Sequence, residues 1–181
     1  MKIILLRHEE RENNVGFYSD LTDNGIQKSL LLYDILKDLN IDFIFSSLFI
    51  RTLHTISDYC IKKDVKVNID YGLYEYMHNP YFLLNKWVNT LNEIDSIKLK
   101  SIINYNYKSI IDKNDINILE NEYQLKNRIT KFMEYLKENY NDKCILLVTH
   151  KGVINKIKDL YFKKTDIDND FEMGHYEIYS L

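Results

Sequence analysis

The side chains with the most chemical capacity in this sequence are two histidines, each placed directly after an apolar run. His8 follows IILLR, and His150 follows CILLVT. Arg7 immediately precedes His8, and Arg51 comes shortly after a third apolar run, IDFIFSS. A neutral imidazole is a good nucleophile. A guanidinium binds phosphate or carboxylate oxygens through two parallel hydrogen bonds. These residue types together favour chemistry on an anion, and phosphate is the natural candidate.

The elements that would position these residues alternate along the chain. Apolar runs at 2–6, 41–46, 65–69 and 144–149 are typical of strands buried on both faces. Helical periodicity is found at 21–39, 48–62, 120–139 and 152–162, and a last strand is expected at 176–181. This alternation predicts an α/β fold, a three-layer α/β/α sandwich with a mostly parallel central sheet.

Ligands of parallel sheets bind beyond the carboxyl ends of the strands. His8, His150 and the Ser46–Ser47 pair before Arg51 all stand at such ends. If their strands are neighbours, two histidines and two arginines converge on one place, where their positive charges repel unless an anion is bound. The chain also contains only four arginines, at 7, 11, 51 and 128, although lysine is abundant. Arginine at these positions therefore suggests a need for the planar guanidinium.

Composition limits the other functions that the chain can have. Its 181 residues suit one domain, and the net charge of -3 offers no basic field for nucleic acid or a membrane surface. The apolar run at the N-terminus is too short for a signal peptide, and no segment is long enough for a membrane span. We therefore expect a cytoplasmic protein. Cys60 and Cys144 lack metal-binding spacing and are expected to be buried free thiols.

Several short motifs occur in a fixed order and carry a family resemblance. They are Arg7-His8-Glu9-Glu10-Arg11 with Asn14, Leu21-Thr22-Asp23-Asn24-Gly25, Ser46-Ser47 with Arg51, Leu73-Tyr74-Glu75, Glu120 with Arg128, and Val148-Thr149-His150-Lys151-Gly152. In this order they resemble the histidine phosphatase superfamily, branch 1, which includes the cofactor-dependent phosphoglycerate mutases. The resemblance covers nearly the whole chain and implies a phosphoglycerate mutase-like fold.

The resemblance also implies a role for each matching residue. His8 would be the nucleophile that forms a phosphohistidine, and Glu75 would be the proton donor for the leaving oxygen. Arg7, Asn14, Arg51 and His150 would bind the phosphate, with His150 also assisting catalysis. No metal and no cofactor are expected. The predicted activity is hydrolysis of phosphate monoesters, with a small phosphorylated metabolite as the substrate.

Two other functions stay open at this point. A mutase-type phosphotransferase, an isomerase, is less favoured because such enzymes resemble longer chains. Two departures from the family motifs suggest a weakly active phosphate-binding pseudoenzyme. Glu9 stands where the family has a small residue and is expected to crowd the pocket. Lys151 stands where the family has a residue like glycine.

The remaining expectations concern the middle of the chain. Residues 76–119 are expected to form a cap or insertion over the active site within one domain spanning 1–181. The tyrosines that could line the pocket there are Tyr76, Tyr81, Tyr105 and Tyr107. Glu120 and Arg128, eight residues apart in a predicted helix, are expected on one face of that helix without direct contact.

Overall fold

The computed structural model describes residues 1–14, 16–78, 80, 91–163 and 171–181. Within these ranges, no helix combines the length and the apolar character that crossing a membrane requires. Cys60 and Cys144 are buried free thiols, as the sequence predicts.

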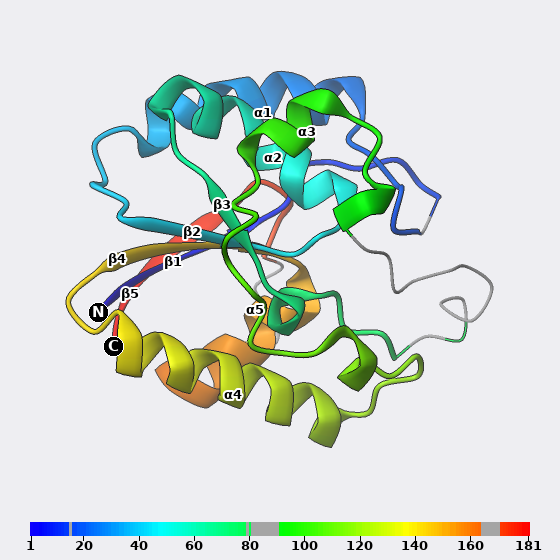
Figure 1. Ribbon diagram of the computed structural model, residues 1–181, viewed down its shortest axis with the longest axis vertical. Helices are drawn as coiled ribbons and strands as arrows, with labels where there is room; N and C mark the ends of the chain where they lie inside the picture. The colour runs from blue at the N-terminus through cyan, green and yellow to red at the C-terminus, as the bar shows by residue number, and fades with distance from the viewer. Residues whose placement is uncertain (15, 79, 81–90, 164–170) are drawn as a thin grey trace.

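A five-stranded sheet runs through the centre of the molecule (Figure 1). Its strands are β1 (Lys2–Arg7), β2 (Phe43–Ser46), β3 (Val67–Ile69), β4 (Cys144–Thr149) and β5 (Tyr176–Ser180), in the spatial order β3-β2-β4-β1-β5. The first four are mutually parallel, and β5 pairs antiparallel with β1. The predicted, mostly parallel sheet is confirmed.

Helices cover both faces of this sheet (Figure 1). On one face lie α1 (Asp23–Leu36), α2 (Ile50–Lys63) and α3 (Ile97–Ile102), and on the other lie α4 (Glu122–Asn139) and α5 (Lys151–Ile157). Shorter helical turns are η1 (Tyr71–Leu73), η3 (Leu91–Glu93), η4 (Lys113–Asp115) and the π-helical η5 (Lys158–Phe162). Successive side chains of a strand point to opposite faces of the sheet. In β1, Ile4 and Leu6 pack in the core on one face, and Ile3 and Leu5 pack in the core on the other. Each core is covered by a layer of helices, which gives three layers.

Two helix starts follow local capping rules. Thr22 accepts a hydrogen bond from the amide of Gly25 and so caps α1. Asn121 and Gln124 form a reciprocal capping box that starts α4 at Glu122. The helix predicted at 120–139 therefore begins two residues later than expected, which places Glu120 outside it.

The described part of segment 76–119 is attached to the main fold at several points. Helix α3 is tied to α2 by the Lys98–Asp58 ion pair at 2.9 Å. The buried carboxylate of Asp70 accepts hydrogen bonds from the Tyr107 hydroxyl and the Ile110 amide. That this segment caps the active site stays a prediction, since 79 and 81–90 lie outside the described residues.

Candidate active site

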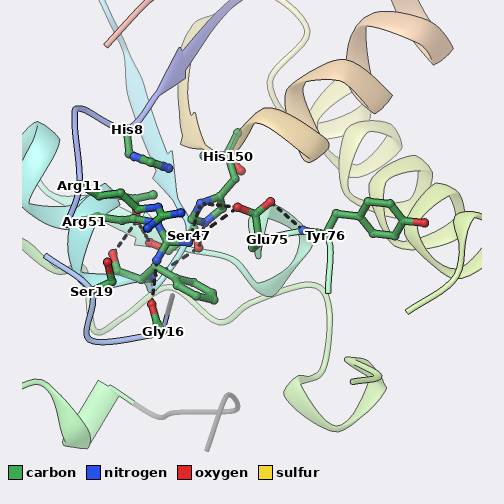
Figure 2. Close-up of polar contacts among 12 residues, drawn as sticks. His8, Arg11, Gly16, Ser19, Ser47, Arg51, Glu75, Tyr76 and His150 are labelled. Carbon is green, nitrogen blue, oxygen red and sulfur yellow. Dashed lines mark hydrogen bonds and ion pairs between the residues drawn. The ribbon is translucent and has the colours of Figure 1, made fainter. Parts of the chain in front are cut away.

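Backbone pairing brings the two strand-end histidines together. Strands β1 and β4 are neighbours, with Arg7 paired to Thr149 in the register. The ladder continues one residue further, because the His8 amide donates to the Thr149 carbonyl at 3.1 Å. The rings of His8 and His150 consequently lie with their centroids 5.3 Å apart (Figure 2).

His8 is buried and has a defined tautomer. Its Nδ1 lies 2.8 Å from the backbone carbonyl oxygen of Glu9, which can only accept a hydrogen bond. Nδ1 therefore carries the proton, and Nε2 keeps the lone pair. Burial, followed by the charge of Arg51, holds the pKa of His8 well below its usual value. The imidazole is thus neutral and ready to act as a nucleophile.

Arg51 projects from the first turn of α2 into the same place (Figure 2). Its Nη1 donates to the Gly16 carbonyl at 2.8 Å, and its Nη2 lies 3.3 Å from His150 Nδ1. The side chain is only 2% exposed, and burial lowers its pKa to about 10, which leaves it charged at neutral pH. Its Nε is buried and has no hydrogen-bond partner among the described residues, as expected for a group that receives an anion.

His150 is fully buried between Arg51 and Ser47. A guanidinium can only donate, so Nδ1 of His150 accepts from Arg51, and its Nε2 donates to the Ser47 hydroxyl at 3.0 Å. Burial, with the charge of Arg51 next, holds the pKa of His150 well below its usual value. The cluster therefore combines neutral imidazoles with permanently charged guanidinium groups.

Two residues near the C-terminus, Phe171 and Gly174, form hydrogen bonds with Arg7. Its Nη1 donates to the Phe171 carbonyl at 2.6 Å, and the Gly174 amide donates to the carbonyls of Arg7 and His8. Arg7 directly precedes His8 in the chain, and its charge contributes to lowering the pKa of both histidines. The segment 171–174, just before β5, thus fixes the positions of Arg7 and His8 through hydrogen bonds.

Glu75 reaches the edge of the cluster from the chain that follows η1 (Figure 2). Its Oε2 lies 3.4 Å from His150 Nδ1 and 3.7 Å from Arg51 Nη2, while Oε1 accepts from the Tyr76 amide. Gly152 allows this approach, since a Cβ there would lie 2.9 Å from the Cβ of Tyr76. The structure therefore brings Arg7, His8, Arg51, Glu75 and His150 together.

Asn14 is not brought into this group. It is exposed, and its backbone carbonyl accepts a hydrogen bond from Arg11. Arg11 itself lies beside Arg51 in Figure 2. Its charge contributes to lowering the pKa of His8 and Arg51. Arg11 thus adds the charge of a third guanidinium at His8, and the scarcity of arginine in the sequence is the signal that points to it.

Glu9 packs against a residue near the C-terminus, a contact that the sequence did not suggest. Its side chain is buried against Gly174, where a Cβ would lie 2.2 Å from Glu9 Oε1. The charges that act on its carboxyl are those of Lys28 and Glu10, and burial raises its pKa. The Glu9 carboxyl thus lies against the Gly174 backbone, while its backbone carbonyl fixes the His8 tautomer.

The expectation that Glu120 and Arg128 do not touch is wrong. Because Glu120 precedes the α4 N-cap, its carboxylate can approach the Arg128 guanidinium. The two side chains form a buried double hydrogen bond, at 2.6 Å from Nε to Oε1 and 2.7 Å from Nη2 to Oε2.

The candidate pocket tyrosines lie in different surroundings. Tyr76 is half-buried beside Gly152, and Tyr105 is exposed. Tyr107 donates to Asp70 and packs edge-on against Phe45 in the core. Tyr81 lies outside the described residues, and Lys151 is half-buried at the start of α5.

Solved structures share this fold. An ecdysone phosphate phosphatase from Bombix mori, in complex with tungstate, is 13% identical with a TM-score of 0.68, covering 98% of this chain and 88% of that one. The alpha-ribazole phosphatase from Shigella flexneri is 20% identical with a TM-score of 0.67, covering 98% and 89%. A mycobacterial glucosyl-3-phosphoglycerate phosphatase with inorganic phosphate is 14% identical with a TM-score of 0.68, covering 99% and 89%.

A search of curated proteins finds no match to the sequence. The family model described as histidine phosphatase superfamily (branch 1), however, matches residues 3–177, which is nearly the full length. The chain therefore belongs to the histidine phosphatase superfamily, branch 1.

Proposed function

We propose that this protein is a phosphatase that hydrolyses phosphate monoesters of small metabolites through a phosphohistidine on His8. The observation that carries the proposal is the buried His8, which has its proton on Nδ1 and lies beside Arg51 and His150. Such a site combines a neutral nucleophile with positive charge that can stabilise a phosphoryl group.

In the first step, Nε2 of His8 attacks the phosphorus atom of the ester. The bond from phosphorus to the ester oxygen breaks as the bond from nitrogen to phosphorus forms. Arg7 and Arg51 supply the positive charge that stabilises the negative charge spread over the other phosphate oxygens, and His150 holds Arg51 through its Nδ1. The Glu75 carboxyl gives its proton to the leaving oxygen, which departs as an alcohol.

In the second step, water attacks the phosphohistidine from the side that the alcohol has left. Glu75, now a carboxylate, takes a proton from this water as the new oxygen–phosphorus bond forms. The nitrogen–phosphorus bond breaks, and its electron pair returns to Nε2 of His8. Inorganic phosphate leaves, and both His8 and Glu75 recover their initial states.

The relatives described above support this choice of activity. Three of them are named as phosphatases of different phosphorylated small molecules, and one of these is seen with inorganic phosphate. A mutase would need to protect the phosphohistidine from water until a second substrate arrives. No contact among the described residues favours that alternative.

The proposal is tested by measuring phosphate release from a panel of phosphate monoesters. The parent protein should release phosphate from at least one of them, and His8→Ala should reduce this rate by about a thousandfold or more because no nucleophile remains. His54→Gln is a matched control, since His54 also lies on α2 but pairs with Asp20, before the start of α1. This variant should keep the parent's rate.

The intermediate can be trapped by quenching the turnover of a phosphate-labelled ester with an alkaline denaturant. A phosphohistidine is labile in acid and stable in base, so its label should survive alkaline treatment and be absent in His8→Ala. Release of phosphate that is unaffected by His8→Ala would overturn the mechanism. Faster isomerisation of 3-phosphoglycerate than phosphate release, in the presence of 2,3-bisphosphoglycerate, would make the protein a mutase instead.

A further inference from the structure

The buried ion pair of Glu120 and Arg128 touches the chain segment that carries Glu75. Arg128 has more donors than the Glu120 carboxylate accepts. Its Nη1 donates to the Gly72 carbonyl at 2.8 Å, and its Nη2 also donates to the Glu75 carbonyl at 3.1 Å. One guanidinium therefore holds two points on segment 72–75 at the same time.

Glu120 extends this attachment on its own side. Its backbone amide donates to the Met77 carbonyl at 2.9 Å, just beyond Glu75. Its carboxylate keeps Arg128 in place through two parallel bonds, a geometry that fixes the plane of the guanidinium. Three carbonyls around Glu75, those of Gly72, Glu75 and Met77, are thus anchored by this one pair.

We propose that the Glu120–Arg128 pair is a positioning device for the Glu75 carboxyl, which rests on the proposed function of Glu75 as the proton donor. The backbone carbonyl that Arg128 binds belongs to Glu75 itself. On the other side, Glu75 Oε2 lies 3.4 Å from His150 Nδ1 (Figure 2). Proton transfer to a leaving oxygen requires placement within hydrogen-bond reach, so a shift of this backbone would weaken it.

Burial makes the Glu120–Arg128 ion pair rigid. Arg128 and Glu120 are 6% and 3% exposed, so water cannot readily replace their mutual bonds. The opposite side of the segment is held independently, because the Thr149 hydroxyl donates to the Leu73 carbonyl at 2.6 Å. The acid-bearing segment is therefore fixed between the start of α4 and the end of β4.

The experiment measures kcat/KM for phosphate esters whose leaving groups differ in basicity. A good leaving group such as p-nitrophenolate needs little protonation, whereas an alkoxide needs a well-placed acid. Arg128→Lys keeps the charge but loses the planar fork, so it should lower kcat/KM about tenfold for an alkyl phosphate and less than about threefold for p-nitrophenyl phosphate. Glu75→Gln should show the same pattern more strongly.

A second variant guards against simple misfolding. Glu120→Met combined with Arg128→Met removes both charges together and leaves no unpaired buried ion, so the protein should still fold. It should show the same selective loss on alkyl phosphates. Leu36→Ala on α1, on the opposite face of the sheet, is the control for general destabilisation and should affect both esters equally.

The outcomes separate the two levels of the proposal. Equal losses on both esters in the Arg128 variants, or unchanged rates in a folded double variant, would overturn the positioning role alone. If Glu75→Gln lost activity equally on both esters, the positioning role and the assignment of Glu75 as the proton donor would both be overturned. Hydrolysis that depends on His8 would not be affected by that result. A parent protein that hydrolyses no ester would overturn the proposed function as well.

Discussion

The Nδ1 atom of His8 donates to the backbone carbonyl of Glu9 at 2.8 Å, so the main chain selects which ring nitrogen keeps its lone pair. A side chain at position 9 contributes nothing to this bond. Glu9 can therefore replace a smaller residue without changing the tautomer of His8.

The first prediction concerns the pH dependence of activity. Burial and Arg51 hold the pKa of His8 well below 6.5, so the ring stays neutral when the pH falls through that value. We expect kcat/KM, which reports the free enzyme, to show no decline from His8 between about pH 7.5 and about pH 6. The second ionisation of the substrate phosphate is measured separately and subtracted. A histidine-like decline centred near 6.5 would contradict the prediction.

The second prediction concerns phosphate affinity. In Arg51→Lys the bonds to Gly16 and His150 cannot both be kept, because an ammonium lacks the planar fork. Competitive inhibition by inorganic phosphate should weaken about tenfold, or about 1.4 kcal/mol. Lys137→Met removes a cation over Tyr161, away from the cluster, and should leave the inhibition constant unchanged. Equal inhibition of parent and Arg51→Lys would remove Arg51 from the phosphate site.

The third prediction concerns the contact between Glu9 and Gly174. Gly174 has a φ of +77°, and a Cβ there would lie 2.2 Å from Glu9 Oε1. Gly174→Ala should lower the free energy of unfolding by about 2 kcal/mol or more, from the overlap and from backbone strain. In a Glu9→Gly background the overlap disappears, and only the strain, about 1 kcal/mol, should remain. Urea unfolding of the four proteins measures this coupling, and strict additivity would refute it.

The fourth prediction concerns stability at different pH values. Burial raises the pKa of Glu9 above its ordinary 4.5, so the unfolded chain ionises first as the pH rises. Above pH 4.5, ionisation of Glu9 therefore favours the unfolded state and lowers the stability of the parent. Below this pH it has no effect, because Glu9 is protonated in both the folded and the unfolded state. Glu9→Gln should therefore gain melting temperature over the parent near about pH 8, and lose this advantage near about pH 4. A difference that stays constant with pH would show that folding leaves the pKa of Glu9 unchanged.

The convergence of His8, Arg51 and His150 was predictable because each follows a continuous apolar strand. Parallel neighbours bring such ends to one edge of the sheet, and adjacency of β1, β2 and β4 is what the structure supplies. Glu75 depended on the family motif, since the chain after η1 has no regular pattern of its own.

Other features of the site could not be foreseen from local sequence. Contact between Glu120 and Arg128 depends on whether α4 begins before or after residue 120, and the capping box at Asn121 decides this. The direction of the Glu9 side chain depends on Gly174, which reaches it from the other end of the chain. Such long-range contacts leave no periodic signal.

The hydrogen bond from the His8 amide to the Thr149 carbonyl has an evolutionary consequence. This bond between two peptide groups helps to set the spacing of His8 and His150, and every residue except proline can supply both peptide groups. Apolar residues in the layers above and below can drift, provided that they keep the two strands in register. The arrangement of His8 and His150 therefore depends little on which apolar residues fill the core, and a chain of this kind can diverge far in sequence while its two histidines stay the same distance apart.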